Sequence, residues 1–247
     1  MKKLIFVLND HAEVGKTSVA AALRGYLRDQ EGFDTHLVSI VVGDDPDRDA
    51  APRIHDEIKD LAGVKKADWL YKMVAKHDVT ICDVESGNAS VLVDLYHRND
   101  LELELSDHDI DLTIVTPEVE EAECHEEMCN ISSALSGHAD YIVARIPHDQ
   151  FNSPLEAWEE SDAFDELAYL GAIVVEFPRL TDKIQDRLEE AELEIPEAMA
   201  ADLEALPEEI SIMIADWRRR FRVEIEHAAD YLYPARSRRG LPMAASA

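Results

Sequence analysis

The stretch "NDHAEVGKTSVAAAL", residues 9 to 23, decides how the fold of this chain is interpreted. Its centre, Val14-Gly15-Lys16-Thr17, matches the second half of the phosphate-binding pattern G-x-x-x-x-G-K-S/T and follows an apolar run, Leu4 to Leu8. In such a loop, backbone N–H groups at a helix N-terminus converge on phosphates, the lysine neutralises their charge, and the hydroxyl holds Mg²⁺. The pattern asks for glycine where this chain has Asp10. The residues predicted to bind nucleotide here are Val14, Gly15, Lys16, Thr17 and Ser18.

Two acidic segments follow later strands. Asp83 opens Asp83-Val84-Glu85-Ser86-Gly87, where its carboxylate would hold Mg²⁺ together with Thr17 and Gly87 would approach a γ-phosphate. Asp83 could instead cap the helix expected to start near Asn88. Asp45, after the second strand, is a candidate for orienting an attacking water, with a solvated acidic turn as the alternative. The predicted catalytic residues are therefore Lys16, Asp45 and Asp83.

Short apolar runs alternate with helical patterns along most of the chain. The runs are continuous, as in strands buried on both faces of a parallel sheet. We therefore predict an α/β fold, a doubly wound and mainly parallel sheet of about six or seven strands with helices on both faces. The expected strands are 3–8, 36–42, 79–83, 112–116, 141–146 and 172–177. The expected helices are 16–30, 52–61, 67–77, 89–98, 118–136 and 156–169.

The pattern changes after residue 180. Residues 181–206 are acidic and helical, with a break at Pro196, and Pro207 opens a last helix with an apolar stripe that should dock on the sheet layer. We expect one domain over residues 1–232, with a C-terminal helical elaboration over 181–232 and a mobile tail over 233–247. The stripe consists of Ile210, Met213, Ile214, Trp217, Phe221, Ile225 and Ala228.

Composition narrows the classes of function. The 247 residues are 46% hydrophobic without an apolar stretch long enough to span a membrane, and three cysteines suit a reducing cytoplasm. A net charge of −29 opposes binding to nucleic acid. Arg218, Arg219 and Arg222 are nevertheless either solvated on the last helix or a contact patch for DNA or an acidic partner.

The ordered set of motifs resembles the ParA/MinD family of deviant P-loop ATPases, and most closely the TraL-type proteins of plasmid mobilisation. The likeness rests on Gly-Lys-Thr, on Asp45-Pro46 and on Asp83-x-x-x-Gly87. It extends to "MVAKHDVTICDVESGNASVLVDLY", "IDLTIVTPEV" and "ISIMIADWRRRF". The resemblance implies ATP and Mg²⁺ as ligands, a protein partner, a possible homodimer, and service to a plasmid or other mobile element.

The loop departs from the family at three positions. The family pattern is K-G-G-x-G-K-S/T, and its first lysine reaches the nucleotide of a partner subunit; here these positions are His11, Ala12 and Glu13. The departures predict slow or uncoupled hydrolysis. They also leave open a pseudo-ATPase that serves as an interaction scaffold without binding nucleotide. A dethiobiotin-synthase-like ligase is a further alternative, because its loop resembles Glu13 to Thr17, although its Lys-Pro stretch after the second strand has no counterpart here.

Overall fold

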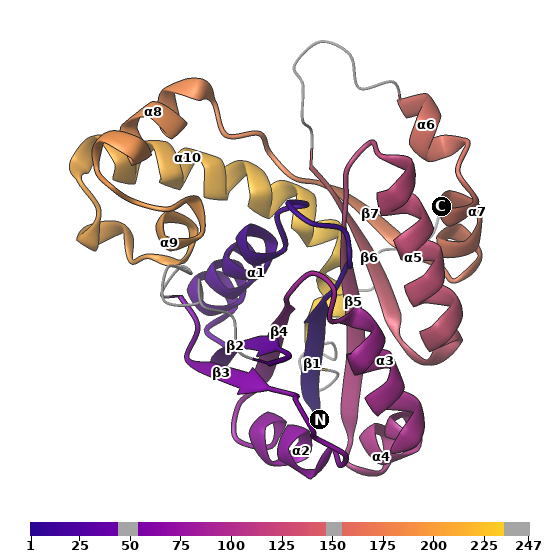
Figure 1. Cartoon of the computed structure of the whole chain (residues 1–247). Helices are drawn as coiled ribbons and strands as arrows, with labels where there is room; N and C mark the ends of the chain where they lie inside the picture. The colour runs from indigo at the N-terminus through magenta and orange to yellow at the C-terminus, as the bar shows by residue number, and fades with distance from the viewer. Residues whose placement is uncertain (44–53, 147–154, 235–247) are drawn as a thin grey trace, which may run out of the picture.

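The computed structural model describes residues 1–43, 54–146 and 155–234, and its centre is one seven-stranded sheet (Figure 1). The strand order is β3-β2-β4-β1-β5-β6-β7, and every neighbouring pair is parallel. This topology confirms the predicted doubly wound fold. The strands are β1 (Lys2–Val7), β2 (Thr35–Val41), β3 (Glu57–Asp60), β4 (Val79–Val84), β5 (Ile110–Glu118), β6 (Asp140–Arg145) and β7 (Ile173–Glu176).

Helices cover both faces of this sheet (Figure 1). One face carries α2 (Asp68–Val74), α3 (Ala89–Arg98), α4 (Leu101–Asp107), α5 (Ala122–Leu135), α6 (Leu155–Glu159) and α7 (Asp162–Tyr169). The other carries α1 (Lys16–Glu31), α8 (Asp182–Glu190), α9 (Ile195–Ala200), α10 (Glu208–Ile225) and α11 (Ala229–Leu232). Single 3₁₀ turns lie at Ser136–His138, Leu203–Ala205 and Glu226–Ala228. Each face has its own buried apolar cluster, because the strands present side chains to both sides.

Three elements differ from the predictions. The helix expected at 52–61 is wrong over its described part, where β3 forms a short, largely exposed edge strand against β2. The helix expected at 156–169 is two helices, because Ser161 ends the first and caps α7 by accepting a hydrogen bond from the Phe164 N–H. Helix α4 was not predicted at all. Pro196 lies in the first turn of α9, a position that proline tolerates, so the break precedes it.

The predicted apolar stripe of α10 does pack against the sheet layer. Trp217, Phe221 and Ile225 are almost fully buried, and Trp217 Nε1 donates to the Pro178 carbonyl over 2.5 Å. Met213 is the member of the stripe that stays partly exposed. Because α10 holds the chain just after β7, it also fixes one wall of the site described below. Across the described part of the chain, the helices are too short or too polar to cross a membrane.

Candidate nucleotide-binding site

The loop between β1 and α1 contains residues with positive φ angles, a feature that it shares with anion-binding nests. Glu13 and Gly15 both have positive φ angles, 59° and 75°, on either side of Val14. For Glu13, which is exposed, this left-handed conformation costs about 1–2 kcal/mol. A Cβ atom at Gly15 would also lie 2.9 Å from Ile146 Cδ1, so a larger residue there would have to displace that side chain. No side chain caps the start of α1, so its first N–H groups remain available to a ligand.

Lys16 is buried in the middle of this loop. Its ammonium Nζ donates to the His11 carbonyl over 2.9 Å and to Ser86 Oγ over 2.7 Å, and the residue is only 7% exposed. Burial lowers the pKa of Lys16, and the nearby carboxylates of Asp83 and Asp10 partly oppose this shift. Both hydrogen-bond acceptors are neutral. The loop therefore holds a buried cation whose direct partners do not neutralise it, as a receptor for an anion requires.

Asp83 is the last residue but one of strand β4, beside the loop and in register with Val7 of β1. Its carboxylate is buried, and Oδ2 lies 3.0 Å from His55 Nε2. Asp83 does not cap α3, because the Ala89 N–H donates instead to Asp10 Oδ1 over 2.8 Å. Asp10, the residue that replaces the first glycine of the pattern, thus ties the loop to α3. His55 was missed in the sequence because it belongs to no motif.

The other predicted site residues are placed as follows. Val14 is buried in the core, so only its backbone can face a ligand. Thr17 and Ser18 are half-buried in the first turn of α1. Gly87 lies in an exposed turn with a φ of 80°, which suits glycine. Asp45 falls outside the described residues.

A cavity of about 240 Å³ adjoins the loop. One side is formed by Gly15 and Ser18, and the opposite side by the chain after β6 and β7 together with α8 and α9. Ile146 and Phe177 give it apolar walls, whereas Arg179 and Gln185 bring polar groups. A pocket of this character, placed directly beside a phosphate loop, could accept a nucleoside.

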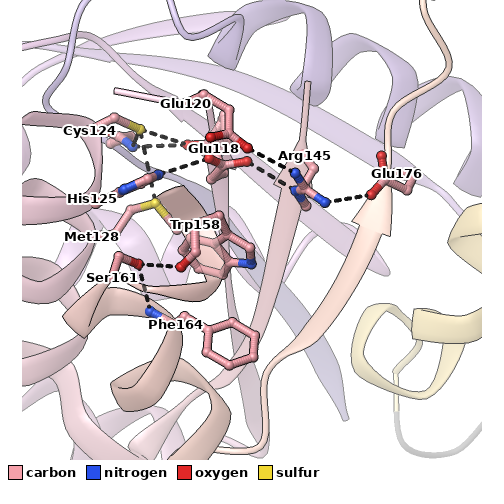
Figure 2. Close-up of polar contacts among 12 residues, drawn as sticks. Glu118, Glu120, Cys124, His125, Met128, Arg145, Trp158, Ser161, Phe164 and Glu176 are labelled. Atoms are coloured by element: carbon pink, nitrogen blue, oxygen red, sulfur yellow. Dashed lines mark hydrogen bonds and ion pairs between the residues drawn. The ribbon is translucent and has the colours of Figure 1, made fainter. Parts of the chain in front are cut away.

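A second cluster of charges lies at the same edge of the sheet, at the ends of β5, β6 and β7 (Figure 2). Arg145 pairs with Glu118 at 3.2 Å, with Glu120 at 3.3 Å and with Glu176 at 3.0 Å. Glu118 is 1% exposed and also lies 2.9 Å from His125 Nε2. The imidazole of His125 packs edge-on against Trp158. The buried guanidinium of Arg145 is thus paired with carboxylates, and the buried carboxylate of Glu118 contacts both Arg145 and His125. Sequence reasoning missed the cluster because its members share no motif.

This cluster is connected to the phosphate loop through the end of β5 and the segment that follows it. The Asn9 side chain donates to the Pro117 carbonyl over 2.9 Å, and His11 Nε2 lies 3.1 Å from Glu121 Oε2. His11, Glu121 and Glu123 offer ligand atoms within 4.8 Å of one another, a spacing at which one His and two carboxylates could hold a divalent cation. Both glutamates are exposed to solvent.

The arginines of α10 have carboxylate partners. Arg218 is partly buried, donates to the Met199 and Ala201 carbonyls and pairs with Asp29 at 3.1 Å. Arg219 and Arg220 both pair with Asp216, and Arg222 pairs with Glu226 at 2.7 Å. Arg218 therefore fastens α10 to α9. Arg219 and Arg220 share the carboxylate of Asp216 on α10, and the partner of Arg222 is Glu226, directly after that helix.

Comparison with solved structures gives similar folds at low sequence identity. The MinC:MinD cell division protein complex of Aquifex aeolicus has 12% identity and a TM-score of 0.48, over 91% of this chain and 97% of that chain. The MinD cell division protein of Aquifex aeolicus has 16% identity and a TM-score of 0.46, over 91% and 98%. A Cyanothece McdA–ATP complex has 12% identity and a TM-score of 0.44, over 89% and 95%. No protein-family model and no curated protein sequence matches the chain.

Proposed function

We propose that this protein binds a nucleoside triphosphate with Mg²⁺ as a ParA/MinD-like P-loop ATPase. The observation that carries the proposal is the buried ammonium of Lys16, held between two neutral acceptors at the start of α1. Since the direct partners of the ammonium are neutral, an arriving phosphate would supply the missing negative charge. ATP is the nucleotide that the sequence resemblance implies.

The donor set at the loop fits a magnesium–phosphate ligand. Thr17 and Asp83 offer the oxygen atoms that Mg²⁺ prefers, and the ion would neutralise phosphate charge. His55 lies 3.0 Å from Asp83 and would fix the orientation of its carboxylate. Gly87 leaves room near Ser86, because nothing lies within 4 Å of the Cβ position. Asp45 remains our candidate for orienting the attacking water.

Turnover in this proposal is slow or not coupled to dimerisation. His11 takes the place of the family's first lysine, and its side chain is engaged with Glu121 of the same chain. The ordered motifs support a role for a plasmid or other mobile element of the kind that TraL-type proteins serve.

The proposal includes a protein partner, and a homodimer is possible. A net charge of −29 favours a basic protein surface and disfavours nucleic acid, and the pairing of the α10 arginines adds to that preference. We also propose that residues 1–232 act as one domain of a cytoplasmic protein. The packing of α8, α9 and α10 with α1 around one buried cluster supports the single domain.

Calorimetric titration with ATP–Mg²⁺ tests the proposal. Lys16→Ala should remove nucleotide binding, because the ammonium supplies the main phosphate charge. Lys72→Ala, an exposed lysine on α2, is the matched control and should bind as the wild type does. Equal affinity in Lys16→Ala and wild type would contradict the proposal.

The second candidate function is an interaction scaffold that has lost nucleotide binding. It is favoured by Glu13, whose carboxylate sits on the loop where repulsion from a triphosphate would cost about 1 kcal/mol or more unless it stays in solvent. A wild-type chain that binds no nucleoside triphosphate in the same titration would establish this alternative.

Replacing His11-Ala12-Glu13 by Lys-Gly-Gly tests the claim of slow turnover. The lysine would restore the contact to a partner's nucleotide, and the glycines would relieve the left-handed strain at Glu13. We expect ATPase activity to rise and ATP to promote dimers, as measured by phosphate release and light scattering. Strong ATP-dependent dimerisation of the wild type would contradict the claim.

A further inference from the structure

Arg24 on α1 holds the short segment that leads into strand β3. Its guanidinium donates from Nη1 to the Ile54 carbonyl over 2.6 Å and from Nη2 to Asp56 Oδ1 over 2.8 Å. Asp56 is also fixed to β2, because its N–H donates to the Leu37 carbonyl over 2.8 Å and its Oδ2 accepts from the Leu37 N–H over 2.9 Å. A planar guanidinium that makes two directed contacts fixes geometry better than a point charge does. The backbone on both sides of His55 is therefore held by α1.

His55, the residue held in this way, contacts the proposed Mg²⁺ ligand Asp83. His55 Nε2 lies 3.0 Å from Asp83 Oδ2, and the two side chains are only 9% and 7% exposed. The hydrogen-bond partners of a metal ligand fix its orientation, and their removal commonly lowers metal affinity by about tenfold to a hundredfold. Because the backbone beside His55 is held by Arg24, the direction from which the imidazole meets Asp83 is set by α1.

A second histidine–aspartate pair of the same length shows that distance alone does not create this arrangement. His77 Nδ1 lies 3.0 Å from Asp34 Oδ2, but these side chains are 25% and 61% exposed. Solvent competes for such a contact, and Asp34 directly precedes β2, at the end of the sheet opposite the phosphate loop. The pair of His55 and Asp83 differs in its burial, in its place beside the loop and in the anchoring by Arg24.

Both proposed Mg²⁺ ligands are connected to the same helix. Thr17 lies in the first turn of α1, and Arg24 follows seven residues later, a spacing that brings two side chains to the same side of a helix. Helix α1 thus carries Thr17 directly and reaches Asp83 through Arg24 and His55. We propose that Arg24 is a positioning residue for Mg²⁺ at this site and acts through His55 on Asp83, an inference that rests on the proposed function.

The test is a calorimetric titration of the full chain with ATP, once with Mg²⁺ and once with EDTA. The ratio of the two affinities measures the contribution of Mg²⁺. His55→Ala should lower this ratio by about tenfold or more and Arg24→Met by about threefold to tenfold, while the affinity in EDTA stays at the wild-type value. The double variant should lose no more than His55→Ala alone, because both changes act on Asp83 through one contact. Arg24→Lys keeps a charged donor without the planar fork and should recover part of the ratio.

Arg28→Met and His77→Ala are the matched controls. Arg28 lies one turn further along α1 and pairs with Asp29, and His77 belongs to the exposed pair described above. Both variants should keep the wild-type ratio.

Three results overturn the inference and leave the proposed function standing: a wild-type ratio in Arg24→Met, equal losses of affinity with Mg²⁺ and in EDTA, or losses that add in the double variant. Equal losses in the two conditions would mean that Arg24 only supports the fold. A wild-type chain that binds ATP equally well with Mg²⁺ and in EDTA overturns the inference together with the proposed magnesium site. Failure of the wild-type chain to bind ATP in either condition overturns the proposed function and the inference with it.

Discussion

The two charged regions at the carboxyl edge of the sheet satisfy their charges in opposite ways. At the phosphate loop, the buried ammonium of Lys16 contacts a carbonyl and a hydroxyl. Three strands of the same sheet meet at Arg145, where the guanidinium contacts three carboxylates and one of them also meets His125. In the first arrangement the direct partners of the buried cation are neutral, and in the second the buried cation is paired with carboxylates. Burial of a charge alone therefore does not identify a binding site; the charge of its partners has to be considered as well.

The largest expected effect is a loss of folding stability when Arg145 is replaced. Arg145→Met should destabilise the fold by about 3–5 kcal/mol, because it leaves Glu118 buried with only His125 as partner. Urea denaturation followed by circular dichroism measures the change. Arg187→Met is the control, since Arg187 also pairs with two carboxylates but on the surface, where solvent screens such pairs and their loss should hardly change stability. Equal losses of stability in the two variants would show that the buried cluster stabilises the fold no more than a surface ion pair does.

The fold was predictable where the sequence repeats a simple period. Strands β1 and β4 are continuous apolar runs, and α10 carries its stripe at helical spacing, so both patterns identify their elements. Strand β3 was not predictable, because its sequence Glu-Ile-Lys-Asp is polar, as suits a short edge strand that faces solvent. The split between α6 and α7 depends on one capping serine, Ser161, inside a pattern that is otherwise helical.

The candidate site was predictable only where it forms a motif. Lys16 and Asp83 are found from the sequence because their local patterns fix their chemistry. His55 and Arg145 are not, since their partners Asp83 and Glu118 lie 28 and 27 residues away along the chain. Such pairs are created by the register of parallel strands and by loops between them. The spacing of residues along the sequence does not predict that register, so it does not predict these contacts.

An effect of intermediate size is expected at the phosphate loop, where Lys16 can be replaced by an uncharged residue. Lys16→Met should leave the unliganded fold as stable as the wild type or more stable by about 1 kcal/mol, because it removes a buried charge that lacks an anionic partner. The pKa of Lys16 is lowered in the folded state, so the protonated form is the one that burial disfavours. As pH rises through the folded pKa, the folded lysine loses its proton first and the penalty is relieved.

The difference in the free energy of unfolding between Lys16→Met and wild type should therefore be constant at neutral pH. It should shrink as the pH rises toward 10.5, the ordinary pKa of a lysine. Urea denaturation at neutral and alkaline pH measures it. A loss of stability in Lys16→Met comparable to that in Arg145→Met would show that Lys16 stabilises the fold as Arg145 does. The two regions would then not differ in how their buried charges act.

The smallest effect concerns the exposed arginines of α10, which belong to neither region. Replacing Arg219 and Arg222 by Gln should change stability by less than about 0.5 kcal/mol, because their ion pairs with Asp216 and Glu226 are exposed to solvent. Arg218→Gln is the contrasting variant and should cost more, since Arg218 also holds the Met199 and Ala201 carbonyls. A gel shift with random duplex DNA at low and moderate salt completes the test. We expect no binding from wild type or variant, because a body of net charge −29 repels a polyanion. Tight binding that weakens steeply with salt and disappears in the double variant would instead make these arginines a DNA contact.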